Sequence, residues 1–210
     1  MEDKFKKITG YSLILGSVLL IFAMTFHPTG GSIENILNTK ALFISSHSLA
    51  LLSLPFIGFG FLGLSDTLKF TNRISYLGLA FSSFGLIAAM IAGAVNGFAL
   101  PLYISNVSNQ EINIDTVTLI IKYGSFLNAS MDYISILSLG IAIIIWSSLI
   151  IKNDKRFKWI GYLGFVIFTL GIFAAIFGFN LIGLFAFRFV VFGIVIWILI
   201  TAYNLLIKSV

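Results

Sequence analysis

The amino-acid sequence predicts an all-α, polytopic membrane protein: a single domain built as a bundle of six transmembrane helices. Hydrophobic residues make up 59% of the 210 residues and charged residues only 10%. The mean hydropathy of +1.05 is far above that of soluble domains. The apolar residues form six runs, each of roughly the 20 residues that cross a bilayer as a helix. These runs lie near residues 8–27, 42–64, 74–100, 124–151, 158–179 and 183–207.

The first run is predicted to be a retained spanning helix and not a cleaved signal peptide. Lys4, Lys6 and Lys7 precede it, as in a signal peptide, but the run is long and has no small-residue cleavage pattern at its end. It ends at Thr25-Phe26-His27-Pro28, where proline stops the helix.

Proline and small residues shape the second and third helices. Pro55 lies inside the second run and predicts a kink, and Pro101 is predicted to end the third helix. The third run also carries small residues at four-residue spacing, which let another helix approach closely. That neighbour belongs either to this chain or to a second copy in a homo-oligomer. The small residues are Gly85, Ala89, Gly93 and Gly97.

The fourth run carries one polar stripe. Its polar residues follow spacings of three, three, four and three, which place them on one face of a helix. Because polar groups are costly in lipid, this face is expected to point into the bundle or a water-filled cavity. The stripe consists of Lys122, Ser125, Asn128, Asp132 and Ser135.

Similar segments along the chain indicate either an internal repeat or a coincidence. The first, third and fifth helices each begin with a basic residue followed by Tyr11, Tyr76 or Tyr162, although any cytoplasmic boundary favours such residues. The segments 51–54 and 136–139 also align and set His47 opposite Asp132. Three related helical hairpins would all run in the same direction through the membrane.

The basic residues predict the orientation. By the positive-inside rule, both termini lie in the cytoplasm, which agrees with an even number of helices. Only Lys40, Lys122 and Arg188 fall on the other side. The basic residues at the cytoplasmic ends are Lys4, Lys6, Lys7, Lys69, Arg73, Lys152, Lys155, Arg156, Lys158 and Lys208.

Several functional classes are excluded by composition. The chain has no cysteine, which rules out disulfides, thiolate metal sites, iron–sulfur clusters and covalent haem attachment. The net charge of +5 is explained by membrane orientation, so no nucleic-acid partner is expected. The bilayer is the expected environment, and the sequence assigns no cofactor.

The strongest functional signal is a set of polar residues predicted to share one depth in the outer half of the membrane. With a helix rise of about 1.5 Å per residue, several of them lie roughly 6–8 Å below the outer boundary. Such residues mark a site when they face the bundle interior. His27 lies at a helix end, and the predicted ligand-binding residues are His47, Asn96, Asn128, Asp132 and Arg188.

Asp132 and Arg188 admit two interpretations that can hold together. They could form an ion pair that ties the fourth helix to the sixth, since each charge alone is costly in the membrane. Alternatively, Arg188 could bind an anionic lipid phosphate or carboxylate while Asp132 orients a neighbour or moves a proton.

A metal site is a second hypothesis. His27, His47 and Asp132 could hold a metal ion with an open position for activated water, and two histidines could also hold a haem. Against a metal, no two histidines share a helix at ligand spacing and Arg188 would repel a cation. Ser46 beside His47 supplies a hydroxyl without a recognisable nucleophile motif.

Three short motifs resemble small six-helix bacterial inner-membrane proteins of unknown function. They are Phe26-His27-Pro28, Asn96-Gly97-Phe98-Ala99-Leu100-Pro101 and Trp159-Ile160-Gly161-Tyr162-Leu163-Gly164. The resemblance spans most of the chain and implies six helices in a bacterial inner membrane. It implies no activity.

The leading hypothesis is therefore a membrane protein that binds a small or lipid-like, anionic ligand in a polar pocket in the outer half of the bundle. The alternatives are a metal-dependent hydrolase acting on a lipid and a proton-coupled transporter that uses Asp132. Whether the protein is an enzyme is left open.

Overall fold

The computed structural model describes residues 2–30, 32–69, 72–107, 114–153, 157–177, 180 and 183–207, and every regular element in them is helical. The elements are α1 (Glu2–Thr25), α2 (Ile33–Asn38), α3 (Lys40–Leu68), α4 (Ser75–Ala94), the π-helix η1 (Val95–Ala99), α5 (Leu100–Val107), α6 (Ile114–Asn153), α7 (Lys158–Ile176) and α8 (Leu184–Ile207).

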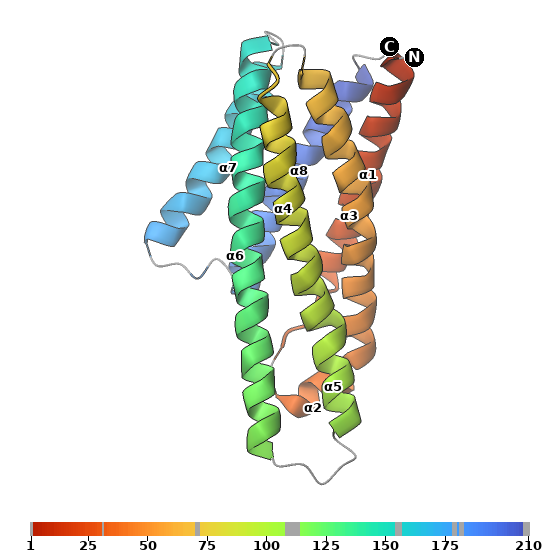
Figure 1. Ribbon diagram of the computed structural model, residues 1–210, viewed down its shortest axis with the longest axis vertical. Helices are drawn as coiled ribbons and strands as arrows, with labels where there is room; N and C mark the ends of the chain where they lie inside the picture. Colours follow the sequence, from red (N-terminus) through yellow and green to blue (C-terminus); the bar gives the residue numbers. More distant parts are fainter. Residues whose placement is uncertain are drawn as a thin grey trace.

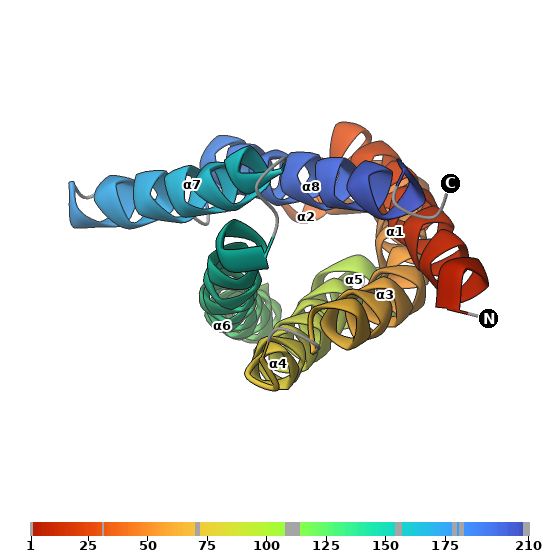
Figure 2. The same cartoon turned by 90° about the horizontal axis from the view of Figure 1, so that it is seen from above.

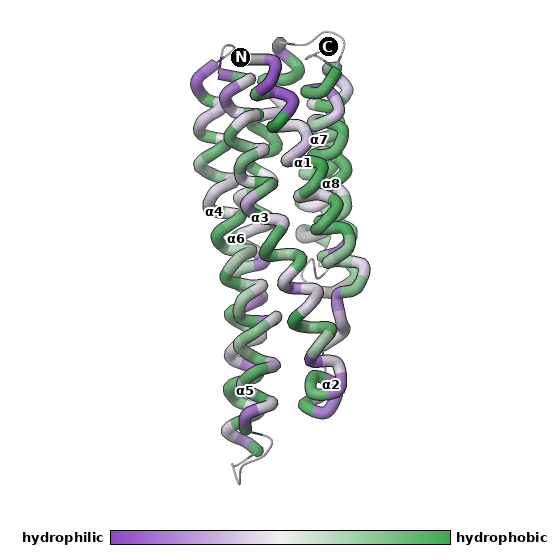
Figure 3. Tube along the Cα trace, turned by 90° about the vertical axis from the view of Figure 1, so that its right-hand side faces the viewer, coloured by the Kyte–Doolittle hydropathy of each residue, from purple (hydrophilic) through white to green (hydrophobic). Residues whose placement is uncertain are grey.

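Six of these helices form a closed ring. In space, α1 packs on α3, α3 on α4, α4 on α6, α6 on α7, α7 on α8, and α8 on α1 (Figures 1 and 2). The two termini lie at the same end of the bundle, and α2 lies at the opposite end (Figure 1). Hydrophilic residues gather at these two ends, with an apolar zone between them (Figure 3).

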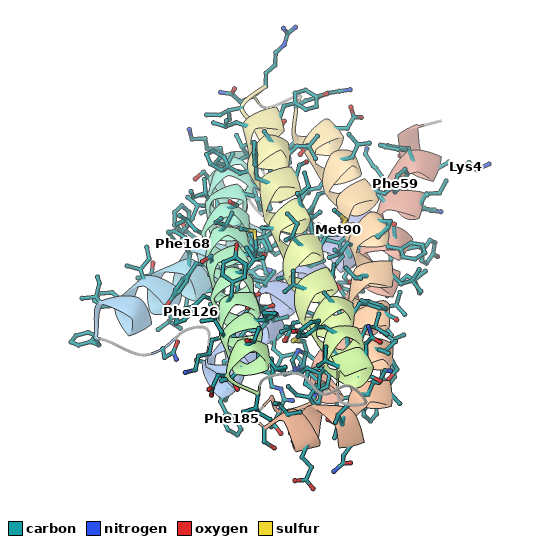
Figure 4. The ribbon with its side chains drawn as sticks, turned by 60° about the horizontal axis from the view of Figure 1, so that its bottom comes forward. Lys4, Phe59, Met90, Phe126, Phe168 and Phe185 are labelled. Atoms are coloured by element: carbon teal, nitrogen blue, oxygen red, sulfur yellow. The ribbon has the colours of Figure 1, made fainter. Side chains whose placement is uncertain are left out.

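The structure confirms a helical bundle suited to a membrane. Within the described residues, five helices are long and apolar enough to span it. Large apolar side chains such as Phe59, Met90 and Phe126 face outward, as expected for contact with lipid (Figure 4). α7 is apolar but shorter, so a count of six spans and a hairpin repeat stay predictions. The five spans are Asp3–Thr25, Lys40–Leu68, Ser75–Val107, Ile114–Lys152 and Phe185–Ile207.

Pro101 does not end the third helix, contrary to the prediction. The helix continues from α4 through η1 into α5 and reaches Val107. Pro101 is the second residue of α5, and proline is tolerated in a first turn because its missing N–H has no partner there to lose. The π-helix η1 lies just before Pro101 and shifts the helical register between α4 and α5.

The fourth helix begins at Ile114, ten residues before the predicted start at 124. Its extra turns pack at the end of the bundle opposite the termini (Figure 1). Val117 is 5% exposed, and Ile121 packs against a small apolar cluster formed by Ile36, Phe43 and Ile104. Helix formation here depends on tertiary packing. In the sequence, the charged residues Asp115 and Lys122 made this segment look like a loop.

Tryptophan side chains form the centre of the core nearer the termini. Trp146 of α6 and Trp197 of α8 are both fully buried, with ring centroids 6.2 Å apart. The indole of Trp146 donates to Ser65 Oγ at 3.1 Å and to the Ser75 carbonyl at 3.2 Å. The indole of Trp197 donates to the Ile160 carbonyl at 3.1 Å. The buried N–H donors are therefore satisfied while they join helices.

The small residues of the third helix contact helices of the same chain. A Cβ added at Gly85 would meet Leu139 of α6, and one added at Gly97 would meet His47 of α3. Gly93 faces Leu51 of α3. Close approach of α4 to its neighbours in this chain therefore accounts for the spacing without a second copy.

Candidate functional site

A cavity of about 280 Å³ lies inside the ring, lined by residues from α1, α3, α4, η1, α6, α8 and the turn after α1. Five of the six polar residues singled out in the sequence line it: His27, His47, Asn96, Asn128 and Asp132. Arg188 is not among the lining residues. The structure thus brings side chains from sequence positions about 100 residues apart to one cavity.

Polarity changes along the cavity in the same direction on α3, on the α4–η1 segment and on α6, whereas the lining residues of α8 are all apolar. On α3, His47 comes first and Leu54 and Phe61 follow toward the end that carries the termini. On α6, Asn128, Asp132 and Ser135 come first and Leu139 follows. Asn96 of η1, a polar lining residue, likewise lies toward the end opposite the termini. The cavity therefore has a polar end away from the termini and an apolar interior.

Only part of the polar stripe of α6 lines the cavity. Asn128, Asp132 and Ser135 line the cavity, whereas Lys122 and Ser125 are exposed. Ser125 instead lines a smaller neighbouring cavity of about 70 Å³. The stripe therefore follows one helical face, but only its last three residues point into the ring of helices.

The two histidines lie against each other, with ring centroids 4.7 Å apart and planes inclined by 55°. His47 Nδ1 lies 2.8 Å from the Phe43 carbonyl, and His27 Nδ1 lies 2.9 Å from the Pro28 carbonyl. A carbonyl oxygen can only accept a hydrogen bond, so each Nδ1 carries the proton. In the neutral rings, each Nε2 is then an acceptor.

His27 follows the end of the α1 span and is held neutral at pH 7. Burial lowers its pKa to about 4, and the neighbouring His47 ring adds to the lowering, against the opposing hydrogen bond to the Pro28 carbonyl. The charge of Arg188 lowers this pKa further. An imidazole with this pKa offers a lone pair to a ligand and no positive charge.

Asp132 and Arg188 have different partners, and within the described part of the chain they form no ion pair with each other. Asp132 Oδ2 accepts a hydrogen bond from Asn128 Nδ2 at 2.7 Å, one helical turn away. Arg188 donates from an NH2 group to the His27 carbonyl at 2.6 Å. Arg188 therefore ties α8 to the turn that carries His27, and its anion-binding role stays a prediction.

The described residues contain no group of three or more His, Cys, Asp or Glu side chains placed to hold a metal ion. His27 and His47 form a pair, and Asp132 is engaged with Asn128. Two serine hydroxyls near the site donate to helix carbonyls, Ser46 to Phe43 and Ser130 to Phe126.

Gly97 is a site residue that sequence reasoning assigned only to packing. A Cβ at this position would lie 2.2 Å from the His47 Cβ, so only glycine lets the π-helix come this close to α3. The π-helix itself, which places Asn96 on the cavity, left no signal in the sequence. Its position beside the cavity agrees with the frequent occurrence of π-helical turns at functional sites.

Fold and cavity together define a class, a helical membrane bundle with a polar-ended internal cavity. No family model, curated protein or solved structure matches this chain.

Proposed function

We propose that this is an integral membrane protein that binds a small, lipid-like amphipathic ligand in the cavity in the outer half of the bundle. The observation that supports this is the one-sided polarity of the cavity. A polar head group would lie between His47 and Asp132, and an apolar chain would extend past Leu54 toward Phe61 and Ile198. The cavity volume of about 280 Å³ lies just below the ~300–1,000 Å³ typical of small-molecule sites.

The surroundings of the cavity favour entry of the ligand from lipid. Asp132 of α6 and Val191 of α8 line the cavity. α6 packs mainly on α4 and α7, and it meets α8 at Trp146 and Trp197, nearer the termini. α7 diverges from the bundle away from the termini (Figure 1). The outer parts of α6 and α8 carry exposed aromatic side chains, Phe126 at 73% and Phe185 at 75% (Figure 4). An amphipathic molecule in the outer leaflet would meet an apolar approach to the cavity.

For the membrane arrangement, we propose six spans with α7 as the sixth, both termini in the cytoplasm, and a bacterial inner-membrane location. The termini share one end of the bundle (Figure 1), which requires an even number of crossings. Most of the described basic residues lie at that end, which the positive-inside rule assigns to the cytoplasm. Of the basic residues that predicted this orientation, Lys155, Arg156 and Lys208 lie outside the described residues. α6 measures about 60 Å at ~1.5 Å per residue, so it extends beyond a hydrocarbon core of ~30 Å.

Cysteine labelling tests this topology, since the chain has no cysteine of its own. In intact cells, a membrane-impermeant maleimide is expected to label Glu34→Cys, in exposed α2, and not Lys4→Cys. Both variants should react once the membrane is permeabilised, which serves as the control. Labelling of Lys4→Cys alone in intact cells would reverse the orientation.

Filling the cavity tests the binding function. Ala89 lines the cavity from α4, and Ala89→Phe is expected to occupy much of it. Mass spectrometry of lipid extracts from the purified protein should show an amphiphile that is enriched over the bulk membrane in the natural protein and lost in Ala89→Phe. Ala94→Phe is the matched control, because Ala94 is exposed on the same helix and does not line the cavity. Identical lipid profiles for all three proteins would contradict the proposal.

The metal-dependent hydrolase and the proton-coupled transporter are less supported. A hydrolase of the expected kind needs a third ligand beside His27 and His47, and no such group of three occurs in the described residues. A transporter needs a second access route to Asp132, and the apolar lining from Leu139 to Ile198 supplies no polar one.

A further inference from the structure

The polar end of the cavity is rich in hydrogen-bond acceptors. The Nδ1 atoms of His27 and His47 are engaged with backbone carbonyls, so their Nε2 atoms are left as acceptors in the neutral rings. Asp132 Oδ2 accepts from Asn128, and within the described residues Oδ1 has no hydrogen-bond partner. Three side chains from three parts of the chain therefore present acceptors to one cavity.

The donors at the same end are uncharged. They are the amides of Asn96 and Asn128 and the hydroxyl of Ser135, and Asn128 already donates to Asp132. Among the described residues, no Lys or Arg lines the cavity, and Asp132 is the only acidic residue that does. Arg188 instead donates to the backbone carbonyl of His27. Asp132 is part-buried, and a carboxyl group in such a setting is stabilised by a partner that brings protons or positive charge.

We propose that the ligand of this cavity carries a primary ammonium group, which donates hydrogen bonds to Asp132 and to an imidazole Nε2 while its apolar chain fills the rest of the cavity. This inference rests on the proposed binding function and narrows the ligand to an amine-bearing amphiphile. It also replaces the anionic ligand expected from the sequence, because the arginine on which that expectation depended is not among the lining residues.

Four amphiphiles with one common chain separate charge from hydrogen-bond donation. Dodecylamine carries a positive charge and N–H donors, dodecyltrimethylammonium a charge without donors, dodecanol a donor without charge, and dodecanoate a negative charge. Binding is measured by titration calorimetry at pH 7 on the full chain in phosphatidylcholine nanodiscs. Subtracting the signal of the Ala89→Phe variant removes non-specific partition into the lipid.

Dodecylamine is expected to bind about tenfold or more tightly than dodecanol or dodecyltrimethylammonium, with dodecanoate weakest. Asp132→Asn should remove this preference while binding of dodecanol persists, which shows that the cavity is intact. Asp115→Asn is the matched control: it changes a carboxylate of the same helix that is exposed and does not line the cavity. Competition by phosphatidylethanolamine in the nanodisc would identify a membrane phospholipid as the source of the amine, and its absence would identify a free alkylamine. Both outcomes support the proposal.

The failures are distinguishable. Equal binding of the four amphiphiles, or strongest binding of dodecanoate, would overturn the ammonium inference and leave the binding function standing. If none of the four amphiphiles showed binding that is lost in Ala89→Phe, the binding function itself would be overturned. The ligand series on the natural protein decides between these outcomes even if Asp132→Asn fails to fold.

Discussion

Gly97→Ala is expected to destabilise the bundle and to disrupt the cavity at the same time. The added Cβ would lie 2.2 Å from the Cβ and 2.3 Å from the Cγ of His47. The His47 Cβ is fixed to its own helix and cannot move aside by rotation, so η1 and α3 must separate. Overpacking of this kind costs about 1–3 kcal/mol, occasionally more, and we expect a value near the upper end. Thermal unfolding of the purified protein in detergent measures the loss.

Gly171→Ala provides the matched control, since a Cβ at Gly171 meets nothing within 4 Å. Gly171→Ala should leave the thermal unfolding midpoint unchanged or raise it slightly, because alanine favours a helix over glycine by about 1 kcal/mol. In Gly97→Ala, enrichment of the bound amphiphile should also fall, because His47 and Asn96 shift apart. An unchanged midpoint in Gly97→Ala would show that the π-helix can relax without cost.

Trp146→Ala is expected to have the largest effect on stability. The Trp146 side chain is fully buried, its ring centroid lies 4.9 Å from that of Phe61, and its N–H joins α6 to Ser65 of α3 and Ser75 of α4. Truncation of a buried tryptophan costs about 3–5 kcal/mol through lost burial and the remaining cavity. A large fall in the thermal unfolding midpoint should result.

Two variants apportion this effect. Trp146→Phe retains most of the apolar volume and removes the N–H donor, so a smaller loss of about 1 kcal/mol is expected. Trp159→Ala truncates a tryptophan of α7 that is 51% exposed and should change the midpoint little. If Trp146→Ala and Trp159→Ala had equal effects, the burial of Trp146 would not be the source of its contribution.

The spanning helices could be predicted because burial in lipid requires long apolar runs, which are visible without any partner. Their ends were less predictable. The run before residue 124 contains Asp115 and Lys122 and lacks a membrane signal, yet it is helical because Val117 is buried and Ile121 packs against residues of α2, α3 and α5. Those partners are distant in the sequence, so no local pattern reveals them.

The candidate site was predictable as a set of costly polar residues but not as a set of contacts. Asp132 and Arg188 have opposite charges, which suggested an ion pair. In the structure, Asp132 instead accepts a hydrogen bond from Asn128, and Arg188 donates one to the His27 carbonyl. Backbone carbonyls at helix ends are strong acceptors, but a sequence does not show which of them are within reach of a side chain.

The sequence by itself determined that the chain is a helical membrane protein and marked a set of polar residues as candidates, because the cost of placing a polar group in lipid depends on residue type and position along a helix. Only the tertiary structure decided that, among the described residues, the polar end of the cavity presents a carboxyl group and imidazole acceptors and no basic side chain. Which ring nitrogen carries a proton depends on the carbonyls of Phe43 and Pro28, and the route of the cavity depends on how α3, η1 and α6 meet around Gly97. These are relations between atoms that the chain brings together only when it folds.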